Sequence, residues 1–127
     1  TLETAVTWEN LLKVWNAVRT YVNQRPKTVL MIHISHVYES GANLYFTFLS
    51  PMAKGNERND FKVFHKGLID TIQENGGSLS HHHGVGRVLA PWMERHLGKT
   101  SIAAFTAVKK HFDPNNIMNP SGTLGIP

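Results

Sequence analysis

The sequence contains no cysteine among its 127 residues. Without a thiol, the chain can form no disulfide framework, no thiolate metal site and no cysteine nucleophile. It also has no apolar run near the roughly 20 residues that a membrane span needs, and its N-terminus does not resemble a signal peptide. These absences leave a domain whose chemistry must come from histidine, tyrosine and charged side chains.

The charged residues are scattered rather than clustered. Lys and Arg number 13 against 9 Asp and Glu, which gives a net charge of +4. The densest basic stretch is Lys109-Lys110-His111, and the sequence lacks the basic stripe with interleaved aromatics that marks a nucleic-acid track. We therefore expect a solvated surface and no nucleic-acid partner, whereas a ligand that carries a phosphate remains compatible with the charge.

Hydrophobic periodicity predicts an α+β fold. Apolar residues at helical spacing predict helices over about 8–23 and from Phe61 to Ile72. Runs of β-branched and apolar residues predict strands at 2–6, 28–38, 44–49 and, as a short extended stretch, 78–83. This order is the ferredoxin-like β-α-β-β-α-β arrangement, an antiparallel sheet covered by helices on one face.

The last part of the sequence predicts two further helices and an irregular tail. One helix covers 92–97 and stops at Gly98, and the other is capped by Thr100 or Ser101 and ends at Asp113-Pro114. The tail beyond is rich in glycine and proline.

The organisation predicted from this pattern is one structural unit with two parts. Residues 1–80 form the ferredoxin-like part, and residues 81–127 hold the histidine motif, the last helices and the tail. The chain begins at Thr1 without an initiator methionine, already close to structured-looking sequence. We therefore expect it to be a piece of a longer protein.

The most informative segment is Gly76–Gly86, in which three adjacent histidines, His81, His82 and His83, lie between glycine pairs. The glycines free the backbone to bring the imidazoles close to a ligand, and imidazole is the side chain best suited to moving protons near neutral pH. On an extended segment neighbouring side chains point to opposite faces, so the three cannot all ligate one metal without an unusual backbone. A ligand-binding or proton-handling role is favoured over metal binding or a purely structural role.

Other candidates are weaker when judged from the residues alone. Tyr45 lies mid-strand and is as compatible with a core aromatic as with a base, which would need a nearby cation to lower its pKa. His36 could face Tyr45, but the length of the turn leaves the register open, and for His33 and His36 a satisfied core position is favoured. Arg87 is a reasonable anion contact. Asn115, Asn116 and Asn119 have a sufficient explanation as turn formers after a helix.

Two segments resemble a known family. Gly76–Gly86 and Phe112–Pro120 (Phe-Asp-Pro-Asn-Asn-Ile-Met-Asn-Pro) are similar to the C-terminal end of flavin-dependent oxidases of the vanillyl-alcohol oxidase type. The resemblance implies a cap domain that covers the flavin ring and forms the substrate pocket, with FAD bound mainly by a domain absent from this chain. It also implies that the tail, with Asn116 and Asn119, packs beside the flavin as a cofactor-binding segment.

Within this family the sequence resembles the alkyldihydroxyacetonephosphate synthase branch. The likeness lies in Ser80–Gly86, in Leu2–Val6 before Trp8 and in Gly41–Phe46. Related 2-hydroxy-acid dehydrogenases carry a Glu-His pair where this chain has His82, and a hairpin histidine where it has Tyr45. Losing a carboxylate and an imidazole removes ligands that a divalent metal needs, so we expect no metal site.

The resemblance implies an FAD-dependent exchange of the acyl group of acyl-dihydroxyacetone phosphate for a fatty alcohol. It makes Tyr45 the general acid/base, with His81, His82 and His83 tuning it, relaying protons or holding the phosphate. Arg87, where the family has Lys, becomes a contact to the substrate phosphate. The alternatives are a 2-hydroxy-acid dehydrogenase (D-lactate or glycolate type) and a non-enzymatic anion-binding module.

The expected partners are a lipid-like phosphate substrate and the missing FAD-binding domain. Without that domain, we expect the chain to bind FAD weakly, to be inactive, and to be sticky or a homodimer. The expected location is the cytoplasm, or the peroxisome in a eukaryote.

Overall fold

The computed structural model describes residues 1–122 and 124–126. The chain divides into two compact units, Thr1–His82 and His83–Pro127. None of the helices in the described part of the chain combines the length and apolar character needed to cross a bilayer.

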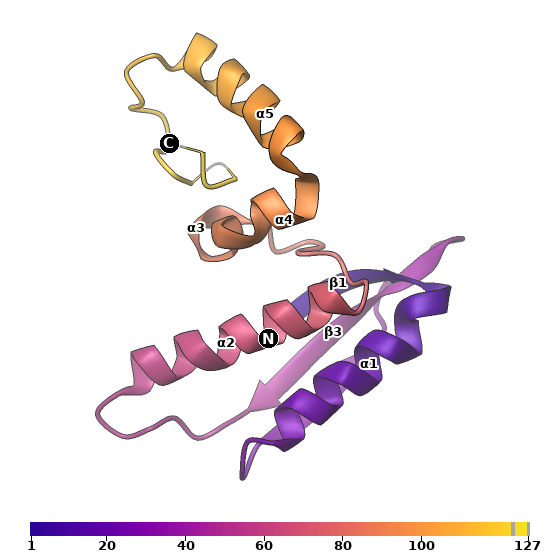
Figure 1. The fold of residues 1–127 in the computed structure, drawn as a ribbon. Coiled ribbons are helices and arrows are strands. Elements are labelled where there is room, and N and C mark those ends of the chain that lie inside the picture. The colour runs from indigo at the N-terminus through magenta and orange to yellow at the C-terminus, as the bar shows by residue number, and fades with distance from the viewer. Residues whose placement is uncertain (123, 127) are drawn as a thin grey trace. The chain divides into compact units, whose positions relative to one another are not determined.

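The first unit is a three-stranded antiparallel sheet with two helices on one face (Figure 1). Its elements are, in chain order, β1 (Leu2–Thr7), α1 (Trp8–Asn23), β2 (Val29–His33), β3 (Gly41–Leu49) and α2 (Glu57–Glu74). The strand order is β1-β3-β2, so the long strand β3 is central. Tyr45 of β3 is the register partner of Glu3 on one side and of His33 on the other.

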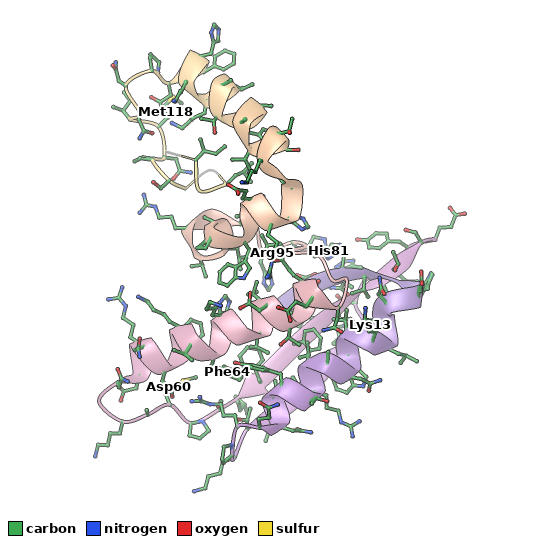
Figure 2. The ribbon with its side chains drawn as sticks, in the orientation of Figure 1. Lys13, Asp60, Phe64, His81, Arg95 and Met118 are labelled. Atoms are coloured by element: carbon green, nitrogen blue, oxygen red, sulfur yellow. The ribbon has the colours of Figure 1, made fainter. Side chains whose placement is uncertain are left out.

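Alternation along the strands sends one set of side chains into the core and the other to the opposite face of the sheet. The apolar set packs against the valines of α1 and the aliphatic stripe of α2, and Figure 2 shows Phe64 of α2 among them. The buried members from the strands are Leu2, Val6, Ala42, Leu44 and Phe46. Burying one such large side chain stabilises the fold by roughly 1.5–3 kcal/mol. The opposite face receives Glu3, Asn43 and Tyr45.

A partly buried ion pair joins the end of α1 to the start of α2. Arg25, just after α1, donates from Nη1 and Nη2 to the two carboxylate oxygens of Asp60 in α2, at 2.8 and 2.5 Å. The guanidinium also donates to Ser50 Oγ and to the carbonyl of Pro51. The bond from Arg25, with a backbone N–H from Ala53, lowers the pKa of Asp60 to about 2.

The α+β class is confirmed, but the fourth strand predicted at 78–83 is wrong, so the sheet is not a complete ferredoxin-like one. Ser78 explains why. Its N–H donates to the carbonyl of Ala5 at 2.9 Å, but its own Oγ accepts the N–H of Ala5, also at 2.9 Å. A side chain thus takes the place of the backbone partner that a continuing ladder requires.

The first hairpin strand is shorter than the predicted 28–38 for a similar reason. Asn43 Oδ1 accepts the N–H and the hydroxyl of Ser35 and the N–H of His36, at 2.9, 2.9 and 3.0 Å. The backbone after His33 therefore bonds to an amide side chain, and regular pairing resumes only as an isolated bridge at Val37.

The second unit is helical, with an irregular tail in its described residues. It contains α3 (Gly86–Leu89), a 3₁₀ turn η1 (Ala90–Trp92), α4 (Met93–Leu97) and α5 (Lys99–Phe112). Gly98 has φ of 82°, a left-handed value that glycine adopts readily, and it separates α4 from α5 as predicted. Leu89, Met93 and Ile126 form the buried centre of this unit.

Candidate functional site

A buried carboxylate lies at the centre of the polar cluster on the first unit. Glu3 of β1 is only 4% exposed, although it faces away from the apolar core. Its Oε1 accepts hydrogen bonds from Asn43 Nδ2 at 2.5 Å, His81 Nδ1 at 2.7 Å and His82 Nδ1 at 3.0 Å. Two of the three predicted histidines are therefore gathered on one oxygen atom.

The electrostatics of Glu3 follow from these bonds. Burial alone would raise the pKa of its carboxyl group, because the charged form loses solvation. The hydrogen bonds from His81, Asn43 and His82 outweigh that penalty and lower the pKa to about 2. Glu3 is consequently ionised at neutral pH and can act only as an acceptor.

The Gly-Gly-Ser sequence before the histidines explains how they reach Glu3. A Cβ atom on Gly77 would lie 2.5 Å from Ile72 Cγ2 and 2.9 Å from Thr4 Oγ1, so only glycine lets the chain pass this close to α2 and β1. The Ser78 carbonyl then accepts Thr4 Oγ1 at 2.7 Å, and the Ser78 side chain bonds to Ala5. These contacts fasten the segment beside β1 at Ser78, three residues before the first histidine.

The connection between β2 and β3 supplies two further ring side chains. The ring centroid of His36 lies 4.4 Å from that of His82 and 5.6 Å from that of His81. The hydroxyl of Tyr38 lies 3.0 Å from His81 Nε2. Asn43 holds this connection through its Oδ1 while its Nδ2 donates to Glu3, so one amide orders both sides of the cluster.

Tyr45 is half-buried in the middle of β3 and is paired in register with Glu3 and His33. Directly paired residues of an antiparallel sheet project from the same face, so Tyr45 shares its face with the carboxylate that holds His81 and His82. The strand residue across from Tyr45 is thus His33, and His36 lies beyond the end of β2. The catalytic role predicted for Tyr45 stays a prediction.

The remaining predicted residues lie in the second unit. His83 is its first residue. Arg87 of α3 donates from Nη2 to the carbonyl of Pro120 at 3.0 Å, so this guanidinium has a bond to the tail. Asn116 and Asn119 adopt left-handed φ values of 51° and 49°, a conformation that asparagine tolerates in turns. Their turn-forming role is therefore observed, whereas cofactor binding stays a prediction.

The tail is shaped by Asp113, at the end of α5. This buried carboxylate accepts the backbone N–H groups of Ile117 and Met118, each at 2.9 Å, and an ion pair from Lys109 Nζ. The bond from Lys109 and the backbone bonds together lower the pKa of Asp113, against the opposing effect of burial. The Asp-Pro-Asn sequence thus encodes a fixed turn.

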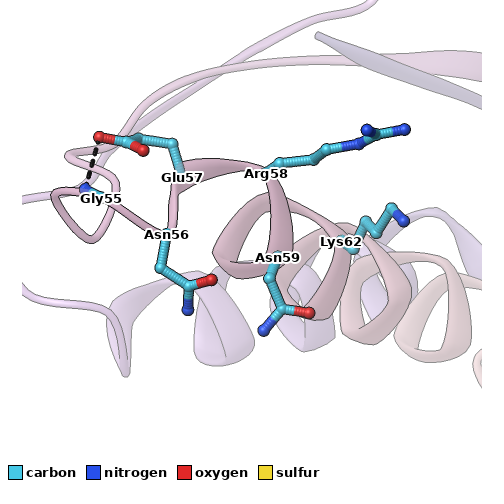
Figure 3. A pocket seen from close by; sticks show the side chains of 6 residues that line it. All are labelled: Gly55, Asn56, Glu57, Arg58, Asn59 and Lys62. Atoms are coloured by element: carbon cyan, nitrogen blue, oxygen red, sulfur yellow. Dashed lines mark hydrogen bonds between the residues drawn. The ribbon is translucent and has the colours of Figure 1, made fainter.

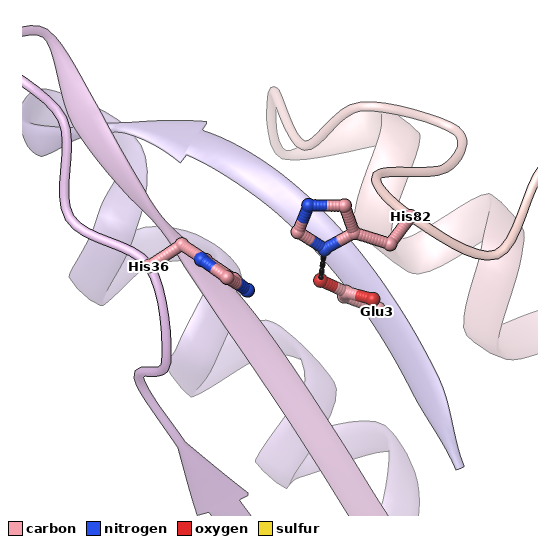
Figure 4. A group of neighbouring side chains, drawn as sticks. All are labelled: Glu3, His36 and His82. Atoms are coloured by element: carbon pink, nitrogen blue, oxygen red, sulfur yellow. Dashed lines mark hydrogen bonds and ion pairs between the residues drawn. The ribbon is translucent and has the colours of Figure 1, made fainter.

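One set of side chains could hold a metal ion. Glu3, His36 and His82 each offer a ligand atom, and these atoms lie within 4.8 Å of one another (Figure 4). Three protein donors of the imidazole and carboxylate type are typical of an open zinc site. The expectation of no metal site rested on a histidine in place of a glutamate at position 82 and on Tyr45 in place of a histidine. It stays a prediction, which the ligand atoms of Glu3, His36 and His82 oppose.

Sequence reasoning missed Glu3, Asn43 and Tyr38. Glu3 could have been found from the sequence, because it is the one charged residue of the predicted strand at 2–6 and a buried charge requires a partner.

A separate surface hollow, lined by Gly55–Asn59 and Lys62 at the start of α2, shares no residue with the cluster (Figure 3).

The chain matches the family described as FAD linked oxidases, C-terminal domain, over residues 1–122. An alkyldihydroxyacetonephosphate synthase of Dictyostelium discoideum is 37% identical over 123 residues, 93% of this chain and 20% of that protein. An uncharacterized FAD-linked oxidoreductase, YgcU of Escherichia coli (strain K12), is 32% identical over 133 residues, 98% of this chain and 27% of that protein.

A solved structure of an alkyldihydroxyacetonephosphate synthase superposes with a TM-score of 0.60 at 30% sequence identity, covering 93% of this chain and 19% of that one. The chain thus spans about a fifth of the length of the synthases that it matches.

Proposed function

The chain belongs to the family of FAD-linked oxidase C-terminal domains, and from that premise we propose that it is the C-terminal part of an FAD-dependent alkyldihydroxyacetonephosphate synthase. The proposed reaction exchanges the acyl group of acyl-dihydroxyacetone phosphate for a fatty alcohol, releasing a fatty acid. The full protein would carry the FAD-binding domain, and FAD would accept electron density from the substrate carbon while its substituent is exchanged.

The observation that carries this proposal is the arrangement around Glu3. Two imidazoles are held by one buried carboxylate, and Tyr45 stands in register with that carboxylate on the same strand pair. Such a set suits a reaction that first removes and later returns a proton beside a carbonyl group. The similarity to synthases over 93% of the chain supports the same choice.

In this proposal Tyr45 takes the proton from the substrate carbon next to the ketone and later returns it. His81 and His82, held by Glu3 on the same polar face, would relay the proton. Arg87 contacts the substrate phosphate, and Asn116 and Asn119 contribute to the flavin side of the site. The tail supports this assignment through its fixed turn, in which Asn116 and Asn119 occupy left-handed positions and Asn116 Oδ1 accepts a hydrogen bond from Lys109 Nζ.

The second candidate is an FAD-dependent 2-hydroxy-acid dehydrogenase. The specific observation in its favour is the group formed by Glu3, His36 and His82, which supplies metal-type donors despite the absence of a glutamate at position 82. A divalent metal there could bind the hydroxyl and carboxylate groups of a 2-hydroxy acid.

The deciding experiment uses the full-length protein loaded with FAD. With acyl-dihydroxyacetone phosphate and a labelled fatty alcohol as substrates, we expect the label to appear in alkyl-dihydroxyacetone phosphate. EDTA should not reduce this exchange. D-lactate and glycolate should not reduce a redox dye. Dye reduction that depends on a divalent metal, without alcohol exchange, would establish the second candidate instead. A full-length protein that binds no flavin and shows neither activity would support an anion-binding module.

A further inference from the structure

Glu3 is the one acidic side chain among the described residues to which two adjacent histidines are hydrogen-bonded. It comes from β1, at the opposite end of the first unit's sequence, and is almost completely buried. A buried carboxylate needs hydrogen-bond donors for its lone pairs, and Asn43 supplies one of them from the neighbouring strand. The recruitment of both imidazoles to the same oxygen calls for a further explanation.

The bonds decide which ring nitrogen carries the proton. A carboxylate that accepts from an amide N–H and two imidazole nitrogens has no proton to give. Nδ1 of His81 and Nδ1 of His82 must therefore both be N–H donors. In the neutral imidazole this leaves Nε2 as the basic atom on each ring.

For His81 the structure also shows where that basic atom is directed. Tyr38 Oη lies 3.0 Å from His81 Nε2, so the tyrosine hydroxyl donates to the neutral ring. A chain of groups results, from the Tyr38 hydroxyl through His81 to the Glu3 carboxylate. A carboxylate that orients an imidazole in this way also stabilises the imidazolium when the ring takes up a proton.

We infer that Glu3 is a positioning residue for proton transfer by the histidine motif, because one of its carboxylate oxygens holds His81 and His82 as Nδ1–H tautomers and leaves Nε2 as the basic atom of each ring. The inference rests on the proposed function, in that these imidazoles serve the proton transfers of the exchange. It adds Tyr38 as the group hydrogen-bonded to His81, a role distinct from that of Tyr45.

The titratable groups around Glu3 come from three elements. His81 and His82 lie on the segment after α2, Tyr45 is on β3, and His36 and Tyr38 lie on the connection between β2 and β3. Glu3 is the charged acceptor shared by the Nδ1–H groups of His81 and His82. Glutamine keeps the size of the side chain but removes this charged acceptor, so both rings lose the bond that orients them.

The test compares Glu3→Gln with the wild type in the full-length flavoprotein. We expect kcat to fall roughly 10- to 100-fold as the imidazoles lose their fixed orientation, while KM changes little, because a positioning residue acts through the histidines rather than by binding the substrate. Tyr38→Phe should lower kcat by a smaller factor, because it removes one bond to His81 alone.

Glu74→Gln is the matched control, because it removes the same charge from an exposed position in α2. It should leave both kcat and KM unchanged. A Glu3→Gln variant with the same kcat and KM as Glu74→Gln would overturn the inference.

A measurement without turnover covers the case in which Glu3→Gln fails to fold. In the ¹⁵N-histidine-labelled wild-type protein, NMR should show His81 and His82 as Nδ1–H tautomers at a pH where both are neutral. Nε2–H tautomers at both positions would overturn the inference. So would one equivalent of zinc in the purified protein, because a metal would replace the proton on Nδ1.

The two proposals can fail separately. If the protein shows no alcohol exchange but both rings are Nδ1–H, the proposed function is wrong, whereas the control of the ring tautomers by Glu3 stands. If exchange occurs and Glu3→Gln leaves kcat unchanged, the proposed function stands and the role of Glu3 is wrong.

Discussion

His81 Nδ1 lies 2.7 Å from Glu3 Oε1, although 78 positions separate the two residues in the sequence. One partner stands in the first strand of the sheet, and the other stands beyond the second long helix. This contact joins the start and the end of the first unit. The hydrogen bonds on the polar face of the sheet can therefore form only when both ends of that unit are folded.

The first prediction concerns the pH dependence of stability. The pKa of Glu3 is lowered from 4.5 to about 2, and that of Asp60 from 3.8 to about 2. The unfolded chain therefore binds more protons in acid, so these groups stabilise the fold above about pH 4.5 and lose that contribution as pH falls to 2. Urea unfolding between pH 2 and pH 7 should show the free energy of unfolding rising with pH in this window. A flat profile there would contradict both assignments.

The second prediction places a second carboxylate beside Glu3. Asn43→Asp replaces the amide that donates to Glu3 Oε1 with a group that is ionised when Glu3 is ionised. Two adjacent buried carboxylates cannot both stay charged without cost, so we expect a loss on the order of 3 kcal/mol at pH 7, smaller at pH 5. Asn59→Asp, at an exposed position of α2, is the control for added charge. Equal effects of the two substitutions at both pH values would refute the prediction.

The third prediction tests the core on the helix side of the sheet. Leu44 is fully buried in β3, and Leu44→Ala should lower the free energy of unfolding by about 2–5 kcal/mol through lost burial and the cavity left behind. Leu49, on the same strand, is 64% exposed, and Leu49→Ala should change stability by no more than about 0.5 kcal/mol. Chemical denaturation of both variants measures the difference, and a similar loss in each would show that the assigned alternation is wrong.

The fourth prediction concerns the close passage at Gly77. Gly77→Ala adds a methyl group that overlaps Ile72 and Thr4, so we expect a loss of about 1–3 kcal/mol. The shift of the following backbone should also change the NMR signals of His81 and His82. Gly55→Ala is the control, because nothing lies within 4 Å of its added Cβ and its cost arises from a φ of +80° alone. Unchanged NMR signals of His81 and His82 in Gly77→Ala would show that this glycine does not position the histidines.

Part of the fold could be predicted from the sequence because its signals are local. The helical spacing of apolar residues, the glycines after the helices and the runs of β-branched residues each act within a few residues. The same reasoning failed at 78–83, where a serine side chain from outside the sheet takes a backbone bond of β1. Whether an extended segment joins a ladder depends on the groups it meets, and those come from distant sequence.

The sequence by itself determined the α+β class, and it predicted a site at a histidine motif between glycines, with Tyr45 on a nearby strand as a candidate partner. It also carried the resemblance that identifies the family. Only the tertiary structure decided that Glu3 and Asn43 complete the cluster, and that Tyr38 bonds to His81. The physical reason is that a buried charge must find its donors in space. The register of β1 and β3, together with the turn at Gly77 and Ser78, brings those donors to one oxygen atom.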